Sequence, residues 1–515
     1  MFKKAAFLFT FLCQISITCF SQNTLIPDPN FEQALIDLGY DTAPVNGSVT
    51  TSDISGIAIL NIDNQNISDL TGIEDFAALS ILECTNNLLT GIDITNNSNL
   101  TQLFVDDNQL AGLDVSNNTL LQILWCDNNQ LVNLDVTNNP ELISLDCGEN
   151  QLTNLDVTNN PKLNVLICDN NQLTSMDISQ NISLDIFFCN NNALTTVDTS
   201  NNLDLKQFNC ANNLLTSLDV TNNTELQEFS FDDNTIAVID ITNNTELTRV
   251  TGNGNILSVL DTSNNTELVE LSIGLNGLSS LDLSSNTKLE QLNCVDNLLC
   301  FINIQNGNNS IITAFEATLN PFLSCVFVDD VAYSTTNWTN IDPVTNFVLS
   351  QSDCDALGNG TPDVDVLSDF VGSSYTLPPL TNGTYHTEPD AGGQQLLPGA
   401  VITTSQTIYI FSSTQCYTNE SSFNVVITSG DFYIPKYFTP NNDNSHDTWK
   451  VIDNAGSFTS IRIYDRYGKL LKSLLPNNFE WDGTFNGQLM NTDDYWFIIY
   501  RDADVPIKGH FTLKR

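Results

Sequence analysis

The chain has 515 residues, of which 41% are hydrophobic and only 15% are charged. Its 16 Lys and Arg residues stand against 61 Asp and Glu residues, so the formal net charge is −45. Such a surface repels nucleic-acid phosphates and anionic lipids, which excludes nucleic acid as a partner and favours cationic partners or divalent cations. The hydrophobic fraction excludes an acidic disordered chain and, with the length, predicts a folded protein of several domains.

The first 21 residues have the pattern of a secretion signal peptide. Two lysines precede an apolar run over residues 5–20, and cleavage is expected between Ser21 and Gln22. The alternative is lipidation of Cys19, although the residue before it is larger than such sites prefer. No later segment is apolar over 18 residues, so no transmembrane segment is expected once the signal is removed.

Residues 22–78 are predicted to form an N-terminal cap and a degenerate first turn of a repeat. Asp28 and Pro29 favour a helix start, and Gly39 favours a helix end. A helix here would cover the open end of the repeat core, because end repeats need caps. Its apolar face would carry Phe31, Leu35 and Leu38.

Residues 79–304 repeat one 21-residue frame, L-x-x-L-x-C-x-x-N-x-L-x-x-L-D-V-T-N-N-x-x, without insertion or deletion. Strict repetition at this period predicts a solenoid, in which each turn buries apolar side chains only against its neighbours. The frame resembles the short bacterial leucine-rich repeat, and the resemblance implies a rigid surface for contacts. Period-two alternation in both halves predicts a strand on one side of each turn, an extended segment on the other, and tight corners without a long helix.

One asparagine of the frame is expected to bond the backbone of a neighbouring turn, because the corner would otherwise leave buried polar groups unpaired. This asparagine column comprises Asn87, Asn108, Asn129, Asn150, Asn171, Asn192, Asn213, Asn234, Asn255, Asn276 and Asn297.

Seven cysteines share another column, in which Val105, Phe231, Gly252 and Ile273 occupy other turns. A column that accepts such residues belongs to an apolar core, so buried free thiols are expected. Disulfides between turns are disfavoured because parallel, in-register side chains would strain the S–S torsion. No His or second Cys column stands beside it, which argues against a metal site. The column comprises Cys84, Cys126, Cys147, Cys168, Cys189, Cys210 and Cys294.

A third column, directly before the cysteines, should point outward on the concave side. Its N-terminal half carries Phe104, Trp125, Ile167 and Phe188, and exposed apolar clusters mark contact sites. The alternative is that these side chains cover one another and only stiffen the sheet. An acidic rim beside them suits a basic or hydroxyl-rich partner, a protein or a polysaccharide. The rim comprises Asp106, Asp127, Asp169 and Asp232.

Two further groups of carboxylates have two alternative roles, which are to stabilise local turns or to bind calcium. Every turn from Asp93 to Asp282 has an Asp followed two residues later by Ser or Thr. This spacing suits an Asx turn, in which the carboxylate accepts local N–H bonds, and calcium between turns is the alternative. Asp443 and Asp447 lie in an oxygen-rich segment that suits calcium or a polar turn. Calcium is therefore the one cofactor that the sequence suggests.

The period is lost over residues 305–357, which resemble the C-terminal cap of related repeat proteins. Short apolar alternations separated by turn clusters then predict an immunoglobulin-like β module over residues 358–430. A disulfide is expected among the cysteines outside the repeat column, because the protein is predicted to be secreted. The sequence leaves the pairing open among Cys300, Cys325, Cys354 and Cys416.

The last segment, residues 431–515, carries a set of motifs in order: YFTPNND, IRIYDRYG, WDGTFNG and, at the end, GHFTLKR. It resembles the gliding-motility-associated, type B sorting domain of the type IX secretion system, although Asn442 replaces the usual Gly. The resemblance implies the outer-membrane type IX secretion machinery as a partner and a secreted or cell-surface location. Its apolar alternation and tight turns predict a β-sandwich.

Catalysis finds no support, because the three His residues lie outside the repeats and no H-E-x-x-H or G-x-S-x-G motif occurs. The sequence therefore predicts a mainly β protein: a leucine-rich repeat solenoid with two caps, followed by two small β-sandwich domains. We expect an exported protein, not an enzyme, that binds another macromolecule for adhesion or recognition. The alternative is a structural spacer of a surface coat without a dedicated ligand.

Overall fold

The computed structural model describes residues 22–358, 360–414, 416–428, 430–441, 446–502 and 505–515. The predicted signal peptide and Asp443 lie outside the described residues. The chain divides into two compact units, Met1–Asp353 and Cys354–Arg515. The domain boundaries predicted within these units stay predictions. No helix in the described part of the chain is long and apolar enough to cross a membrane.

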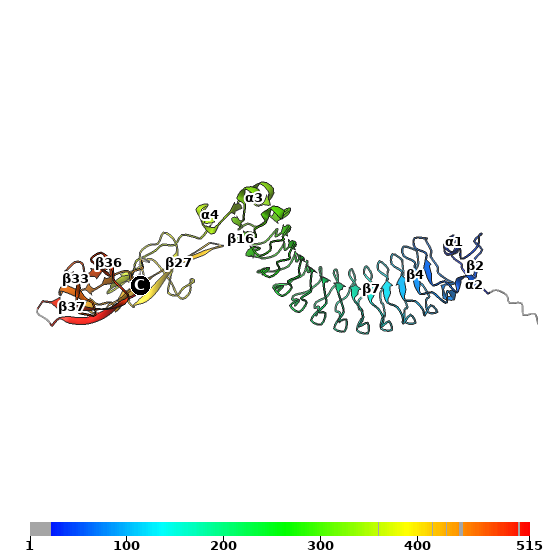
Figure 1. Ribbon diagram of the computed structural model, residues 1–515, viewed down its shortest axis with the longest axis horizontal. Coiled ribbons are helices and arrows are strands. Elements are labelled where there is room, and N and C mark those ends of the chain that lie inside the picture. The colour runs from blue at the N-terminus through cyan, green and yellow to red at the C-terminus, as the bar shows by residue number, and fades with distance from the viewer. Residues whose placement is uncertain (1–21, 359, 415, 429, 442–445, 503–504) are drawn as a thin grey trace, which may run out of the picture. The chain divides into compact units, whose positions relative to one another are not determined.

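The first unit is a curved stack of turns joined by one parallel sheet of 14 strands (Figure 1). Every strand pairs with the equivalent residues of the next turn, so that Leu103 lies opposite Leu124 and Leu124 opposite Leu145. The predicted solenoid is therefore confirmed. The strands are β3 (Ile59–Asn61), β4 (Ile81–Glu83), β5 (Gln102–Phe104), β6 (Ile123–Trp125), β7 (Ser144–Asp146), β8 (Val165–Ile167), β9 (Ile186–Phe188), β10 (Gln207–Asn209), β11 (Glu228–Ser230), β12 (Arg249–Thr251), β13 (Glu270–Ser272), β15 (Gln291–Asn293), β17 (Ala314–Ala317) and β19 (Asn340–Ile341).

The second side of the turns forms a regular sheet only at the C-terminal end of the stack. There the strands β14 (Ser280–Asp282), β16 (Phe301–Asn303), β18 (Cys325–Phe327) and β20 (Asn346–Val348) pair in parallel. In earlier turns, buried asparagines bond the carbonyls of this side: Asn139 Nδ2 donates to Val115 O at 3.0 Å and to Asn118 O at 2.9 Å. The side chain thus replaces a strand partner.

The predicted asparagine column lies at the other corner and forms the expected ladder. Asn150 Nδ2 donates to Cys126 O of the preceding turn at 3.0 Å, and Asn150 Oδ1 accepts from Leu131 N at 2.9 Å. The residue before it, Glu149, has φ +48°, and Asn or Asp fills this left-handed position in most other turns because those residues tolerate it best. Each corner is therefore held by one side chain that bonds two turns.

The N-terminal end of the core is covered as expected. Helix α1 (Pro29–Asp37) begins where Asp28 Oδ1 accepts from Asn30 N and Phe31 N at 2.8 and 3.1 Å. Phe31 and Leu35 are fully buried in the core of the stack, whereas Leu38 lies beyond the helix and is exposed, contrary to the predicted apolar face. The remaining elements here are β1 (Asn23–Leu25), β2 (Ser48–Thr50), α2 (Thr51–Ile54) and the 3-10 turn η1 (Ile73–Asp75).

At the C-terminal end, the segment beyond the strict repeat extends both sheets before it closes the core. Trp338 follows α3 (Val331–Asn337), is buried, and stacks on Phe315 with ring centroids 4.5 Å apart. Such stacking covers the last apolar side chains as a cap must. The 3-10 turn η2 (Asn309–Ile311) and α4 (Gln351–Ala356) complete this end.

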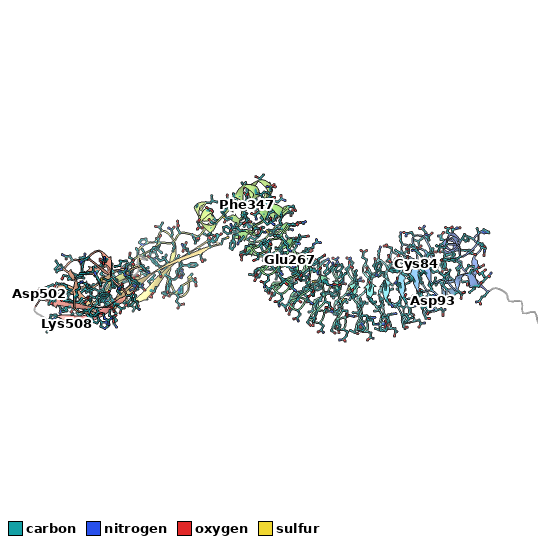
Figure 2. All side chains as sticks on the ribbon, viewed as in Figure 1. Cys84, Asp93, Glu267, Phe347, Asp502 and Lys508 are labelled. Atoms are coloured by element: carbon teal, nitrogen blue, oxygen red, sulfur yellow. The ribbon has the colours of Figure 1, made fainter. Side chains whose placement is uncertain are left out.

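The cysteines behave as two classes. The seven of the repeat column are buried free thiols, as predicted, and Cys84 is labelled in Figure 2. In six of them Sγ contacts a carbonyl of the next turn, as between Cys126 Sγ and Asp146 O at 3.5 Å. The four outside the column, Cys300, Cys325, Cys354 and Cys416, are each disulfide-bonded, which confirms the expected use of disulfides.

The second unit is rich in strands and contains two separate apolar cores. One lies around Tyr385, Ile408 and Phe423, and the other around Trp449 and Phe511. The main sheets run in the orders β21-β27-β26-β23-β24 and β29-β38-β37-β32-β33. The strands are β21 (Phe370–Gly372), β22 (Tyr375–Thr376), β23 (Thr384–His386), β24 (Gln395–Leu396), β25 (Val401–Ile402), β26 (Gln406–Ser413), β27 (Thr418–Ile427), β28 (Phe432–Tyr433), β29 (Tyr437–Phe438), β30 (Trp449–Lys450), β31 (Ile452–Asp453), β32 (Phe458–Tyr464), β33 (Leu470–Leu474), β34 (Glu480–Trp481), β35 (Thr484–Phe485), β36 (Gln488–Leu489), β37 (Asp493–Arg501) and β38 (Ile507–Leu513).

Candidate binding surface on the strand face

The outward side chains of β4 to β13 and of β15 form one continuous surface, here called the strand face. Each of these strands has three residues, of which the central one is buried and the outer two face outward. Because the strands are parallel and in register, equivalent residues of successive turns stand side by side, about 4.8 Å apart. The strand face therefore consists of two columns that can be read along the stack.

The predicted patch residues lie in the first of these columns. The order is Phe104, Trp125, Asp146, Ile167 and Phe188, each opposite the next in the sheet. The structure thus brings the first two together and the last two together, with Asp146 between the pairs. The predicted patch is contiguous along the sheet, although a carboxylate interrupts it.

The aromatic side chains do not cover one another completely. The rings of Phe104 and Trp125 meet edge to face with centroids 5.1 Å apart, and Trp125 Nε1 donates to Ser144 Oγ at 3.2 Å. Trp125 nevertheless keeps 42% of its surface exposed. A tryptophan held by these contacts but open to solvent is pre-ordered for a partner.

The second column of the strand face enlarges the patch, which the sequence-based prediction missed. Ile123, Val165 and Ile186 are the outward residues at the opposite ends of β6, β8 and β9, and all three are half-buried. The period-two pattern itself contained this signal, because residues two apart on a strand share a face. We call the seven residues the apolar patch: Phe104, Ile123, Trp125, Val165, Ile167, Ile186 and Phe188.

A row of carboxylates borders the apolar patch. Burial and, to a smaller extent, the charges of Asp146 and Asp106 together raise the pKa of Asp127 to about 7. Burial likewise raises the pKa of Asp146 to about 6 and, in direction, the pKa of Asp106 and Asp169. Carboxylates that stack in register beside an apolar surface lose solvation and repel one another. A cationic group placed against this row would lower the pKa values and be attracted in turn.

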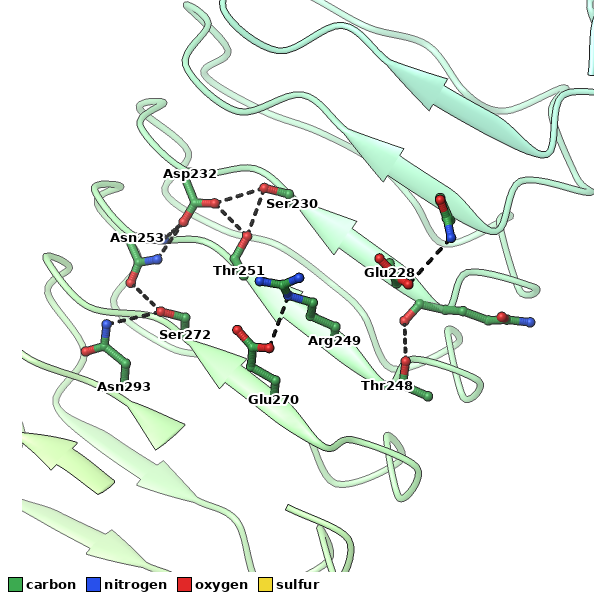
Figure 3. A network of polar contacts seen from close by, with 12 residues as sticks. Glu228, Ser230, Asp232, Thr248, Arg249, Thr251, Asn253, Glu270, Ser272 and Asn293 are labelled. Carbon is green, nitrogen blue, oxygen red and sulfur yellow. Dashed lines mark hydrogen bonds and ion pairs between the residues drawn. The ribbon is translucent and has the colours of Figure 1, made fainter. Parts of the chain in front are cut away.

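The fourth predicted rim residue, Asp232, lies in a different setting on the polar, C-terminal half of the strand face (Figure 3). Asp232 Oδ2 accepts from Ser230 Oγ at 2.9 Å and from Thr251 Oγ1 at 2.5 Å. Its Oδ1 accepts from Asn253 N and Nδ2 at 2.7 and 2.6 Å. All four bonds come from its own or the next turn, so this carboxylate organises the surface.

The network continues along the stack. Ser272 Oγ donates to Asn253 Oδ1 at 3.0 Å, and Asn293 Nδ2 donates to Ser272 Oγ at 3.1 Å (Figure 3). Beside it, Arg249 Nε lies 3.2 Å from Glu270 Oε2. Asp232, Arg249 and Ser272 are among the residues that line an open groove of about 560 Å³, which begins at Phe188. The sequence did not predict these hydrogen bonds, because they depend on the register between turns.

The other predicted groups have local roles in the structure. Asp93 Oδ1 accepts from Thr95 N at 3.1 Å and from Thr95 Oγ1 at 2.6 Å, and these bonds lower the Asp93 pKa. This is the predicted Asx geometry, and Asp93 is exposed on the same turn as buried Cys84 (Figure 2). Asp447 Oδ1 accepts from Asn441 N at 2.9 Å. Within the described residues, no cluster of three or more His, Cys, Asp or Glu side chains could hold a metal ion.

The comparison with protein families matches residues 432–513 to the CHU_C type IX secretion signal domain. These residues form the second apolar core and its sheet, and the solenoid precedes them. The chain has the leucine-rich repeat fold and carries a type IX secretion signal domain. This confirms the resemblance seen in the motifs. The signal domain directs export across the outer membrane, to the cell surface or the medium.

The fold of the leucine-rich repeat part is shared with a solved structure. An internalin (InlF) of Listeria monocytogenes is 21% identical, with TM-score 0.52, over 62% of this chain and 95% of its own. The functional domain of InlJ from Listeria monocytogenes, whose structure is described as including a cysteine ladder, is 24% identical over 79% of this chain and 99% of its own, with TM-score 0.45. No curated protein matches the chain.

Proposed function

We propose that this exported leucine-rich repeat protein binds another protein through the apolar patch, in adhesion or recognition outside the cell. The observation that carries the proposal is Trp125, which is held in place by Phe104 and Ser144 but remains 42% exposed within the patch. Solvent-facing apolar clusters around a tryptophan are typical of contact sites, where a few buried aromatic anchors contribute most of the affinity.

The row of carboxylates beside the patch favours one chemistry of partner. Asp106, Asp127, Asp146 and Asp169 are all half-buried and all have raised pKa values, so any partner that covers them must compensate their charge. Lysine and arginine side chains do this while their stems cover apolar surface. We therefore propose a partner segment in which an aromatic or aliphatic side chain is flanked by Lys or Arg.

Selection of phage-displayed peptides against the purified full chain tests the proposal directly. Wild type is expected to enrich peptides that combine apolar and basic residues, and Trp125→Ala is expected to weaken them about 30-fold, as a central aromatic anchor does. Val238→Ala is the matched control, because Val238 is 73% exposed and lies outside the strand face. Binding should be weaker at pH 5 than at pH 8, because the Asp127 and Asp146 pKa values of about 7 and about 6 place both carboxylates in the neutral form at pH 5.

Other outcomes assign a different function. If polysaccharides on a glycan array bind wild type and not the Trp125 variant, the ligand is a glycan and the protein proposal is wrong. If neither library binds, and variants that lack several whole repeats still attach to cells, the chain is a structural spacer of the surface coat. Deleting residues 431–515 should leave the protein in the periplasm, whichever ligand it binds.

A further inference from the structure

One sheet of the signal domain presents an apolar row on its outer face. In β37, Tyr495, Phe497 and Ile499 point into the core, so Trp496 and Ile498 point away from it. An antiparallel sheet with one face in water normally alternates apolar with polar residues, whereas an unbroken apolar run is typical of a strand covered on both faces. The run from Trp496 to Tyr500 is unbroken and apolar, as in a strand covered on both faces, yet Trp496 is 42% exposed.

Neighbouring strands extend this row across the sheet. Trp496 pairs with Tyr464 of β32 on one side and His510 of β38 on the other, and Tyr464 pairs with Leu470 of β33. Leu470 is 45% exposed, and the Trp496 and His510 rings lie 6.2 Å apart. The row therefore crosses four strands. Other exposed apolar side chains of this domain, such as Leu475 and Leu489, need no such explanation, because scattered single ones are normal on a protein surface.

Basic residues flank the row. Arg462 and Lys508 stand opposite the two sides of Ile498 in the sheet, and the Arg462 guanidinium lies 5.0 Å from the centre of the Tyr500 ring. Ten of the chain's 16 Lys and Arg residues fall within residues 431–515, against four within residues 22–430. In a chain with net charge −45, this concentration of cationic side chains suits a partner whose contact surface is acidic.

We propose that this outer face, centred on Trp496 and Tyr464 and flanked by Arg462 and Lys508, is where the outer-membrane type IX secretion machinery docks on the signal domain. Residues 432–513 match a type IX secretion signal domain, so the partner that we propose is the secretion machinery. The uncovered apolar row with its basic flanks is the surface that this partner contacts. The partner presents an apolar site bordered by carboxylates. The proposal rests on the signal domain alone and stands or falls separately from ligand binding by the strand face.

Site-specific photo-crosslinking in the producing cell tests the contact. A photoreactive phenylalanine analogue at Tyr464 or at Leu470 is expected to form an adduct with an outer-membrane protein of the machinery. The same analogue at Leu489, which is 68% exposed on β36, serves as the control and is expected to form none. Equal adducts from Leu489, or none from Tyr464 and Leu470, would overturn the proposal. An adduct with a second copy of this chain would instead make the face a dimer contact.

Export of variants tests the consequence. Trp496→Ala and Lys508→Glu are each expected to lower the exported fraction at least tenfold and to leave the protein in the periplasm. Leu489→Ala and Lys450→Glu are the matched controls, because both side chains are exposed outside this face. Thermal melting of each purified full chain should match wild type, since the replaced side chains are exposed. Normal export of a folded Trp496→Ala chain would overturn the assignment.

Discussion

Val157→Thr is a core substitution for which the structure predicts an unusual result. Val157 is fully buried, and Asn181 of the next turn donates from Nδ2 to Val157 O at 3.0 Å. Asn181 Oδ1 is buried and receives no hydrogen bond from the residues that the structure describes. In a turn where threonine occupies the same position, Thr199 Oγ1 donates to Asn223 Oδ1 at 2.8 Å. A threonine at position 157 can make the same bond to Asn181.

The expected change in unfolding free energy follows from comparing a threonine hydroxyl without a partner and one bonded to Asn181. A buried hydroxyl without a partner destabilises by about 1–3 kcal/mol, which is the usual result of replacing a core valine by threonine. Here the bond to Asn181 contributes about 0.5–1.5 kcal/mol net and also pairs an acceptor that was unpaired. The two effects offset each other, so we expect a change in unfolding free energy within about 1 kcal/mol of zero.

Urea unfolding of the full chain, followed by circular dichroism, measures this change. The control is Val250→Thr at the centre of β12, where the in-register neighbours are Phe229 and Leu271 and offer no side-chain acceptor. It is expected to lose about 1–3 kcal/mol. The reverse change, Thr199→Val, should also stay within about 1 kcal/mol of zero, because it removes the buried hydroxyl together with its bond to Asn223 Oδ1. If Val157→Thr loses as much as Val250→Thr, the reasoning about the unpaired amide oxygens is wrong.

Three further predictions concern other columns. Asn150→Ala should destabilise the protein by about 1–3 kcal/mol, because it removes the acceptor of Leu131 N. The control Asn154→Ala replaces an exposed side chain and should change stability by less than about 0.5 kcal/mol. The midpoints of urea unfolding distinguish the two variants. Asp127→Asn should not change stability near pH 4 and should stabilise the protein increasingly up to pH 8. The Asp127 pKa is about 7 in the folded chain and about 3.9 in the unfolded chain, so wild type loses stability as the pH rises between these values. Melting temperatures at pH 4, 6 and 8 that show no trend in the difference between variant and wild type would contradict this prediction. The seven column thiols, exemplified by fully buried Cys147 whose pKa burial raises, should react with Ellman's reagent only in denaturant, and rapid native labelling would show that the column is open.

The sequence alone was sufficient for the class of fold and for the inside and outside of each turn. An unbroken period forces every turn into one conformation, so a column that tolerates Cys, Val and Phe must be interior, and Phe104 and Trp125, one residue before it, must point outward. The export assignment also came from local motifs, because the segment from YFTPNND to GHFTLKR is recognisable without coordinates. The exposure of Leu38 was predicted wrongly, because the helix ends one residue earlier than its apolar spacing suggested.

The tertiary structure decided what neighbouring turns do to one another. Packing of the turns sets the Phe104 and Trp125 rings edge to face, and it buries Asp127 beside other carboxylates, which raises the Asp127 pKa. It also turns Asp232 from a predicted rim residue into the acceptor of four bonds from its own and the next turn. The period of the sequence determines whether each side chain points inward or outward. Hydrogen bonds between turns, burial and the pKa values of the carboxylates depend on distances between turns, and these distances exist only once the turns are packed.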